Sequence, residues 1–60
     1  MKIDNAVIHL YPACPYIVKA GVNLRRGGKI VFRTALKDLE ASRRFLAQWE
    51  GLPVKVITHS

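Results

Sequence analysis

Residues 16–34, YIVKAGVNLRRGGKIVFRT, decide the fold, because they hold two β-rich runs on either side of a glycine pair. Residues 16–24 and 29–34 are rich in β-branched and aromatic side chains, which favour strands. Gly27 and Gly28 lie between the runs, and glycine adopts positive φ angles in tight turns without steric cost. The stretch therefore predicts an antiparallel hairpin.

The length of the hairpin loop follows from the alternation of side chains along the two strands. A two-residue Gly-Gly turn would pair Arg26 with Lys29 and mix polar and apolar side chains on both faces. A loop of three or five residues reverses the alternation, which makes one face apolar and the other basic. The apolar face then holds Val18, Ala20, Val22, Leu24, Ile30, Phe32 and Thr34, and the basic face holds Lys19, Asn23, Lys29, Val31 and Arg33. We therefore expect an odd-numbered loop with a glycine in a β-bulge.

Two strands and a helix flank this hairpin in the sequence. Residues 6–11 predict a strand that ends at the prolines of residues 12–15, because proline lacks the N–H that strand pairing needs. Residues 36–50 predict a helix, and residues 54–58 predict the last strand. The β-β-β-α-β order predicts one small α+β domain over residues 1–60, with a mainly antiparallel sheet and one helix packed on one face. The last strand could lie beside the first strand or beside the third.

The predicted helix has its own start and stop signals. Asp38 and Glu40 lie in its first turns, where the helix dipole favours carboxylates, and Gly51 and Pro53 end it. Its apolar stripe consists of Leu39, Ser42, Phe45, Leu46 and Trp49. Packed on the sheet, this stripe predicts a core of Ile8, Leu10, Val18, Val22, Leu24, Ile30, Phe32, Leu39, Phe45, Leu46, Trp49, Val54 and Val56. One helix covers only one face, so the other face must meet water.

The chain is strongly basic, since ten Lys and Arg residues against four Asp and Glu give a net charge of +6. Such a charge favours polyanionic partners, namely nucleic acid, a nucleoprotein complex or an acidic protein surface. Solubility alone is the competing explanation. Cys14 is the only cysteine, which excludes an internal disulfide and favours a reducing, cytoplasmic location. Together with His9 and His59 it lacks the spacing of zinc ligands, so we expect no metal or other cofactor.

The sequence also bears on membranes and on oligomers. The first residues are polar, and the longest apolar stretch, residues 6–18, is interrupted by His9 and two prolines. We therefore expect neither a signal peptide nor a membrane span. So short a chain buries little apolar surface alone, and a homodimer, which would enlarge the core, stays open.

The basic sheet face and the hairpin form the first candidate site. Lys and Arg side chains on paired strands can contact a nucleic-acid backbone, and the glycines let the loop approach a phosphate closely. His9 and Tyr11 lie on the same face by alternation and could stack on bases. The candidate residues for binding nucleic acid or another partner are Lys19, Arg25, Arg26, Lys29, Arg33, Lys55, Tyr11 and, on the outward face of the helix, Arg44. An ordinary solvated sheet face is the alternative interpretation.

His9 and His59 are the candidates for catalysis, because two neighbouring histidines can act as acid and base. They would meet if the first and last strands are neighbours, and a small RNase-type toxin would use such a pair. No carboxylate lies close to either histidine in the sequence, and 60 residues leave little room for a pocket that excludes water. We therefore predict no catalytic residues and a protein that is not an enzyme.

Topology and size suggest two functions. The β-β-β-α order resembles small DNA-binding modules that lay a three-stranded sheet in the major groove. The leading prediction is a small basic protein that binds nucleic acid or a nucleoprotein complex through its basic sheet face and hairpin. In size and charge the chain also resembles accessory proteins of phages and mobile elements, which often inhibit host machines such as CRISPR effector complexes. The alternative is therefore a protein-binding inhibitor or modulator of this anti-CRISPR-like type.

Overall fold

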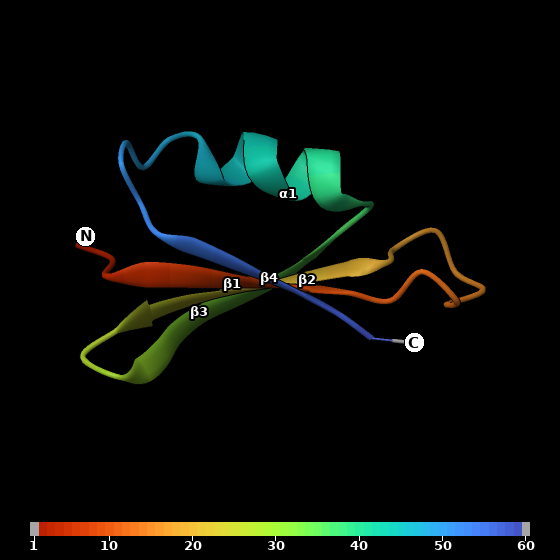
Figure 1. Ribbon diagram of the computed structural model, residues 1–60, viewed down its shortest axis with the longest axis horizontal. Coiled ribbons are helices and arrows are strands. Elements are labelled where there is room, and N and C mark those ends of the chain that lie inside the picture. The colour runs from red at the N-terminus through yellow and green to blue at the C-terminus, as the bar shows by residue number, and fades with distance from the viewer. Residues whose placement is uncertain (1, 60) are drawn as a thin grey trace.

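The computed structural model describes residues 2–59, which form a four-stranded sheet with one helix above it (Figure 1). The elements are β1 (Asn5–Leu10), β2 (Ala20–Arg26), β3 (Lys29–Leu36), α1 (Leu39–Leu46) and β4 (Val54–Thr58). The strand order in the sheet is β3-β2-β1-β4. β2 pairs antiparallel with both β1 and β3, whereas β4 pairs parallel with β1. The α+β class and the order of elements are confirmed, and the sheet is mixed, with its antiparallel pairings in the majority.

The parallel pairing of β4 follows from the path of the chain through α1. The helix carries the chain from the β3 edge across the sheet to the opposite edge, so that β4 runs in the same direction as β1. At the start of this pairing the Ala6 N–H donates to the Pro53 carbonyl at 3.0 Å, and at its end the His59 N–H donates to the Leu10 carbonyl at 2.7 Å. The last strand therefore lies beside the first, which brings His59, the residue after β4, close to His9 in β1.

The turn between β2 and β3 has two residues, so the prediction of an odd-numbered loop is wrong. Arg26 pairs directly with Lys29 across the turn. Gly27 and Gly28 have φ angles of 61° and 79°, the left-handed values that a two-residue hairpin turn requires at both central positions. The paired glycines themselves supply the tight turn, and no longer loop is needed.

A bulge farther along the hairpin restores the expected faces from Phe32 onward. Lys29 and Ile30 lie before the bulge, and their predicted faces are wrong, because Ile30 pairs with Arg25 and Lys29 pairs with Arg26. Leu24 pairs with Phe32, whereas the next residue, Arg25, pairs with Ile30. Val31 is thus the extra residue, and an extra residue reverses the alternation of every position beyond it. The expected bulge exists, but it lies at Val31 and not at a glycine.

Two predicted elements are longer in the sequence pattern than in the structure. β2 begins at Ala20 and not at residue 16, because residues 12–19 form a loop that rejoins the sheet where the Tyr11 N–H donates to the Lys19 carbonyl at 2.8 Å. α1 begins after Asp38, whose carboxylate caps it by accepting a hydrogen bond from the Ala41 N–H at 2.9 Å. Beyond its last residue the chain continues in tighter turns, in which amide groups bond to carbonyls three residues back.

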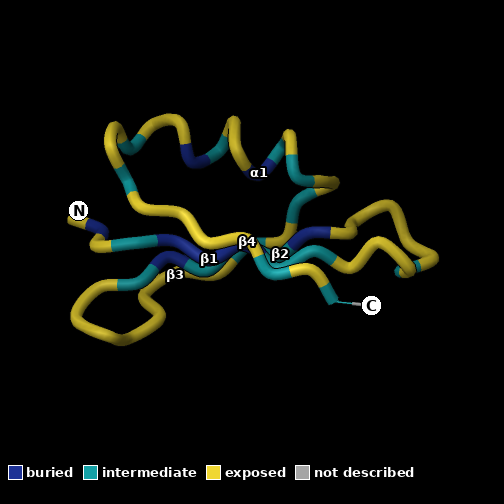
Figure 2. Tube along the Cα trace, in the orientation of Figure 1, coloured by how far each residue is buried: buried dark blue, intermediate teal, exposed yellow. Residues whose placement is uncertain are grey.

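The core lies between α1 and the face of the sheet that it covers, here called the covered face; the other is the open face (Figure 2). The buried core consists of Ile3, Ala6, Ile8, Val22, Leu24 and Leu46, with Leu10, Leu36, Leu39, Phe45, Trp49 and Leu52 packed around it. Five predicted core residues are instead exposed, namely Val18, Ile30, Phe32, Val54 and Val56. Val18 lies in the loop before β2, and Ile30 pairs with Arg25 on the open face. The other three lie on the covered face of edge strands, which a helix of eight residues is too short to cover.

Candidate functional site

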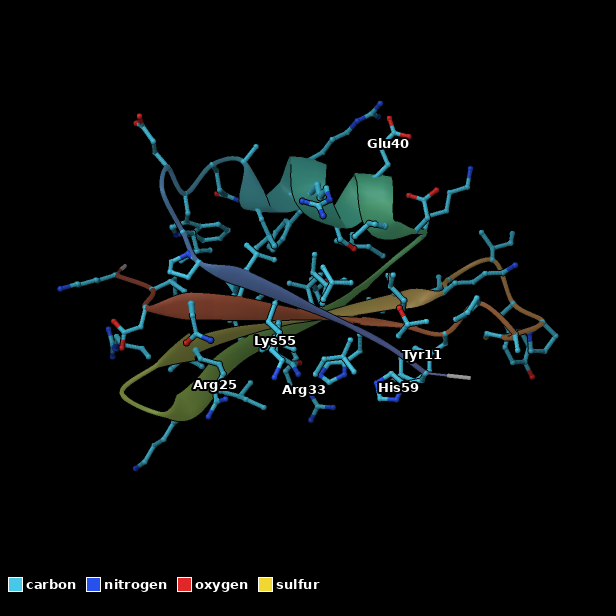
Figure 3. The ribbon with its side chains drawn as sticks, viewed as in Figure 1. Tyr11, Arg25, Arg33, Glu40, Lys55 and His59 are labelled. Atoms are coloured by element: carbon cyan, nitrogen blue, oxygen red, sulfur yellow. The ribbon has the colours of Figure 1, made fainter. Side chains whose placement is uncertain are left out.

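The open face carries rows of side chains that run across the strands. One row consists of Arg33, Asn23, Val7 and Lys55, from β3 to β4. The next row consists of Ala35, Gly21, His9 and Ile57. Figure 3 shows Arg25, Arg33, Lys55, Tyr11 and His59 on the side of the sheet that faces away from α1. A cation therefore stands at each end of the first row, with uncharged side chains between the two.

Charge is divided unevenly between the two layers of the protein. The strands of the described sheet contain no Asp or Glu, and their cations are Arg25, Arg26, Lys29, Arg33 and Lys55. The helix and its flanks, residues 37–50, contain three cations and three carboxylates and so have no net charge. The remaining carboxylate, Asp4, precedes β1 and accepts a hydrogen bond from the Gly27 N–H at 2.8 Å. The positive charge of the protein is therefore concentrated in the sheet.

Three aromatic rings form a stack on the open face, here called the aromatic column: His9 in β1, Tyr11 just after β1 and His59 just after β4. The ring of His59 stacks on Tyr11, with centroids 4.6 Å apart and planes 11° apart, and on His9 at 5.1 Å and 29°. His9 Nδ1 and His59 Nε2 are 2.9 Å apart, so one histidine donates a hydrogen bond to the other. The stack and the hydrogen bond fix the plane of the Tyr11 ring, while 44% of Tyr11 remains exposed.

A groove of about 460 Å³ lies beside the aromatic column. It is lined by Tyr11, Val18, Ala20, Gly21, Asn23, Arg33, Thr34 and Ala35. Gly21 and Ala35 are paired across β2 and β3, and their small size leaves the hollow between Tyr11 at one end and Asn23 and Arg33 at the other. Sequence reasoning missed this groove, although a glycine inside a strand pattern is a known sign that something approaches the backbone closely.

The structure gathers three of the predicted binding cations on the open face. Arg33 and Lys55 lie at the two ends of one row, and Arg25 lies in β2 near the hairpin. The Arg25 guanidinium donates a hydrogen bond to the Gly28 carbonyl at 2.9 Å. Its Nε is buried and has no hydrogen-bond partner among residues 2–59. Arg25 is therefore partly buried and bonded to the hairpin turn, whereas Arg33 and Lys55 are exposed.

Two other predicted cations lie at the tip of the hairpin, and a third lies at the far end of the sheet. Arg26 and Lys29 are exposed and pair with each other, and the alternation along β2 places both on the side of the covered face. Lys19 lines a mostly apolar hollow of about 280 Å³ with Asp38 and Leu39, where the helix begins. These three residues extend the positive charge of the sheet but do not belong to the row of Arg33 and Lys55.

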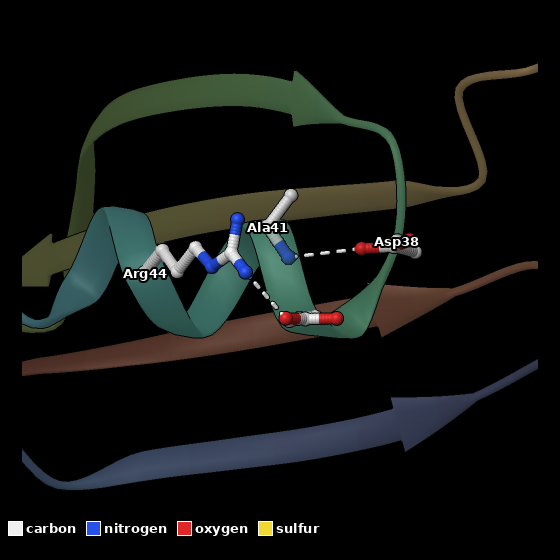
Figure 4. Close-up of polar contacts among 4 residues, drawn as sticks. Asp38, Ala41 and Arg44 are labelled. Atoms are coloured by element: carbon white, nitrogen blue, oxygen red, sulfur yellow. Dashed lines mark hydrogen bonds and ion pairs between the residues drawn. The ribbon is translucent and has the colours of Figure 1, made fainter.

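Arg44 lies on the other layer of the protein. Its Nη2 is 2.6 Å from Glu40 Oε1, an ion pair within α1 whose side chains are 78% and 72% exposed (Figure 4). Figure 3 shows Glu40 on the outer side of the helix, away from the sheet. The structure therefore separates Arg44 from the other predicted binding residues.

Further features and comparisons complete the description of the site. Within residues 2–59, no three His, Cys, Asp or Glu side chains gather as metal ligands would, and Cys14 is a free thiol. Of the helical segments in this range, none has the length and apolar character needed to cross a bilayer.

Comparison with known protein families, with curated proteins and with solved structures finds no match. What the site can do must therefore be argued from its own geometry.

Proposed function

We propose that this protein binds nucleic acid through its open face and that it is not an enzyme. The separation of charge between the layers carries this proposal, since the sheet holds five cations and no carboxylate while the helix layer is neutral. Phosphate groups approaching the open face meet positive charge without repulsion from acids on the same strands. The cytoplasmic location that the single cysteine favours would give access to such a partner.

The spacing of the exposed cations suits an extended phosphate backbone. Arg33 and Lys55 lie at opposite edges of the sheet, three strand spacings apart, which is roughly 14 Å. Two cations at this separation can contact different phosphates of one strand, and the uncharged residues between them leave the path clear. Such contacts give affinity with modest sequence preference, because phosphates carry no sequence information.

The histidine pair supports binding better than catalysis. His9 and His59 are hydrogen-bonded to each other, but the strands around them hold no carboxylate that could orient either ring. The groove beside them is open to solvent, whereas acid–base chemistry gains from a site that excludes water. The rings are stacked on one another, and Tyr11, at one end of the stack, is 44% exposed and so is accessible to a stacking partner.

Fluorescence anisotropy with labelled oligonucleotides at several salt concentrations tests the proposal. We expect binding that weakens linearly in a log–log plot as salt rises. The double variant Arg33→Ala/Lys55→Ala should bind more weakly and lower the slope by roughly 1.5, because each lost phosphate contact removes about 0.7–0.9. The matched control is Lys37→Ala/Arg43→Ala, which removes the same charge from the helix layer and should leave the slope close to that of the wild type.

Two results would contradict the proposal. The first is wild-type protein that binds no nucleic acid at physiological salt. The second is an equal loss for both double variants, which would mean that total charge matters and its position does not.

An exposed apolar loop favours a second candidate, the protein-binding inhibitor or modulator. Tyr16 and Ile17 are 74% and 77% exposed, and they precede Val18, which is 48% exposed. Such side chains are common at the centres of protein interfaces. The variant Tyr16→Ser/Ile17→Ser should retain nucleic-acid binding if the open face acts alone. If wild-type protein binds no nucleic acid but binds an acidic protein that this variant does not bind, the second candidate function replaces the first.

A further inference from the structure

The groove on the open face points to a more specific ligand than a phosphate backbone. We propose that it seats an unpaired base of a single-stranded nucleic acid against Tyr11, while Arg33 holds the adjoining phosphate. This inference rests on the proposed function and adds to it the class of nucleic acid and the place of one base.

The first observation that supports a base in the groove is Gly21, which lines its floor. Its φ angle is not among the positive ones, and it pairs regularly with His9 and Ala35, so the backbone does not require glycine there. A Cβ added at Gly21 would meet no atom of the protein within 4 Å, so packing does not require glycine either. Glycine inside a strand lowers stability relative to residues with a side chain. Its effect here is to keep open the space beside Tyr11.

The second observation is the wall of the groove, which Tyr11 forms. Tyr11 presents an aromatic ring whose plane is fixed by stacking on His59, and His59 is in turn hydrogen-bonded to His9. A fixed ring loses little conformational freedom when a base stacks on it, which favours binding. Every base has a flat aromatic face, so stacking of this kind tolerates any sequence.

The third observation is the pair of polar side chains at the opposite end of the groove. Asn23 and Arg33 are paired across β2 and β3, and both line the groove. The Arg33 guanidinium and the Asn23 amide both offer hydrogen-bond donors to a phosphate. A nucleotide has its base and its phosphate at opposite ends, and the groove has the matching groups at opposite ends.

This arrangement favours single strands over duplexes. In a duplex the bases are stacked and paired inside, and their flat faces cannot reach Tyr11. In a single strand a base can turn outward and stack on an aromatic side chain. DNA and RNA share the bases and phosphates that this groove would contact, so comparing the two kinds of strand tests whether the sugar contributes to binding.

The experiment compares labelled single strands of DNA and RNA, the corresponding duplexes, and an abasic strand with the same phosphates. Wild-type protein should bind single strands more tightly than duplexes, and the abasic strand roughly 5- to 150-fold more weakly than the strand with bases. Gly21→Val, which fills the groove, should bind both strands as weakly as the wild type binds the abasic one. Tyr11→Phe should retain the preference for bases, and Tyr11→Ala should lose it.

A thermal melt of Gly21→Val serves as the folding control. Its midpoint should equal or exceed that of the wild type, because valine favours strands and its Cβ meets nothing. Equal affinity of the wild type for the abasic and normal strands, or tighter binding of duplexes, would overturn the inference. Either result could coexist with the loss of binding in Arg33→Ala/Lys55→Ala, and the proposed function would then stand without the base-binding groove. Absence of binding to every oligonucleotide would remove both.

Discussion

The two faces of the sheet are formed by the same four strands but carry different side chains. The covered face contains Ile8, Val22 and Leu24, which are at most 1% exposed and pack under the helix. The open face contains Arg33, Lys55 and a groove with a glycine floor. Side chains alternate along a strand, so a single stretch of chain supplies both surfaces. The comparison predicts that stability and the proposed binding can be changed separately in this protein, by substitutions one residue apart.

The largest difference between the faces should appear when the same change is made on each. Ile8→Ala, on the covered face, should lower the free energy of unfolding by about 2–5 kcal/mol, because it leaves a cavity at a fully buried site. Ile57→Ala, in the open-face row of His9, should lower it by less than about 1.5 kcal/mol. Urea unfolding followed by circular dichroism measures both.

A small domain has a free energy of unfolding of only about 3–9 kcal/mol, so Ile8→Ala should leave a substantial unfolded population. Equal effects at Ile8 and Ile57 would show that the open face is also buried, for example between two copies of the chain. A transition that depends on protein concentration would identify such a dimer.

The glycines offer the next comparison, between one that the backbone requires and one that it does not. Gly28 has a φ angle of 79°, so Gly28→Ala should destabilise the protein by about 1–2 kcal/mol. Gly21→Ala should leave stability unchanged or raise it by about 0.5–1 kcal/mol, because Gly21 has no positive φ angle. Thermal melts of the two variants should therefore shift in opposite directions, and a loss at Gly21 would contradict the assignment of its role to the groove.

The helix cap gives a smaller effect that is confined to the covered side. Asp38→Ala removes the acceptor for the Ala41 N–H and should cost about 1 kcal/mol of stability. Because Asp38 lies at the start of α1, affinity for nucleic acid should not change once the variant is folded. Asp38→Ser keeps a capping oxygen and serves as the control. A drop in affinity for Asp38→Ala that Asp38→Ser does not share would show that the layers are coupled.

The smallest expected effect concerns the ion pair on the outer side of α1. Glu40 and Arg44 are both mostly exposed, so Glu40→Gln should lower stability by only about 0.3–0.5 kcal/mol. High salt should reduce the difference between the variant and the wild type, because salt screens exposed charges. A difference above 1 kcal/mol, or one insensitive to salt, would mean that this pair is more than a surface contact.

Much of the fold could be predicted from the sequence, because local chemistry determines it. The paired glycines mark the turn, the prolines end β1, and the apolar stripe of the helix includes Ser42, which is fully buried and donates a hydrogen bond to the Asp38 carbonyl at 2.9 Å. The position of the bulge at Val31 could not be predicted, because a bulge there and a longer loop give the same faces from Phe32 onward. The position of β4 depends on packing across the whole sheet, which no local pattern records.

The candidate site was predictable only in part, for the same reason. Alternation placed Arg33, Lys55 and Tyr11 on one face, and the structure shows them there. The contact between His9 and His59 required the pairing of β1 with β4, which the sequence left open. The groove required knowing that Gly21 lies opposite Ala35, and that pairing depends on the bulge.

The most direct test of the central claim, that the open face binds nucleic acid, is a charge reversal made on each layer in turn. Arg33→Glu/Lys55→Glu and Lys37→Glu/Arg43→Glu have the same net charge, and anisotropy at one physiological salt concentration compares their affinities for a single-stranded oligonucleotide. The open-face variant should lose roughly 100-fold, as expected for two charged contacts of at least about 1.4 kcal/mol each, and the helix variant should lose much less. Equal losses, or a larger loss for the helix variant, would contradict the claim.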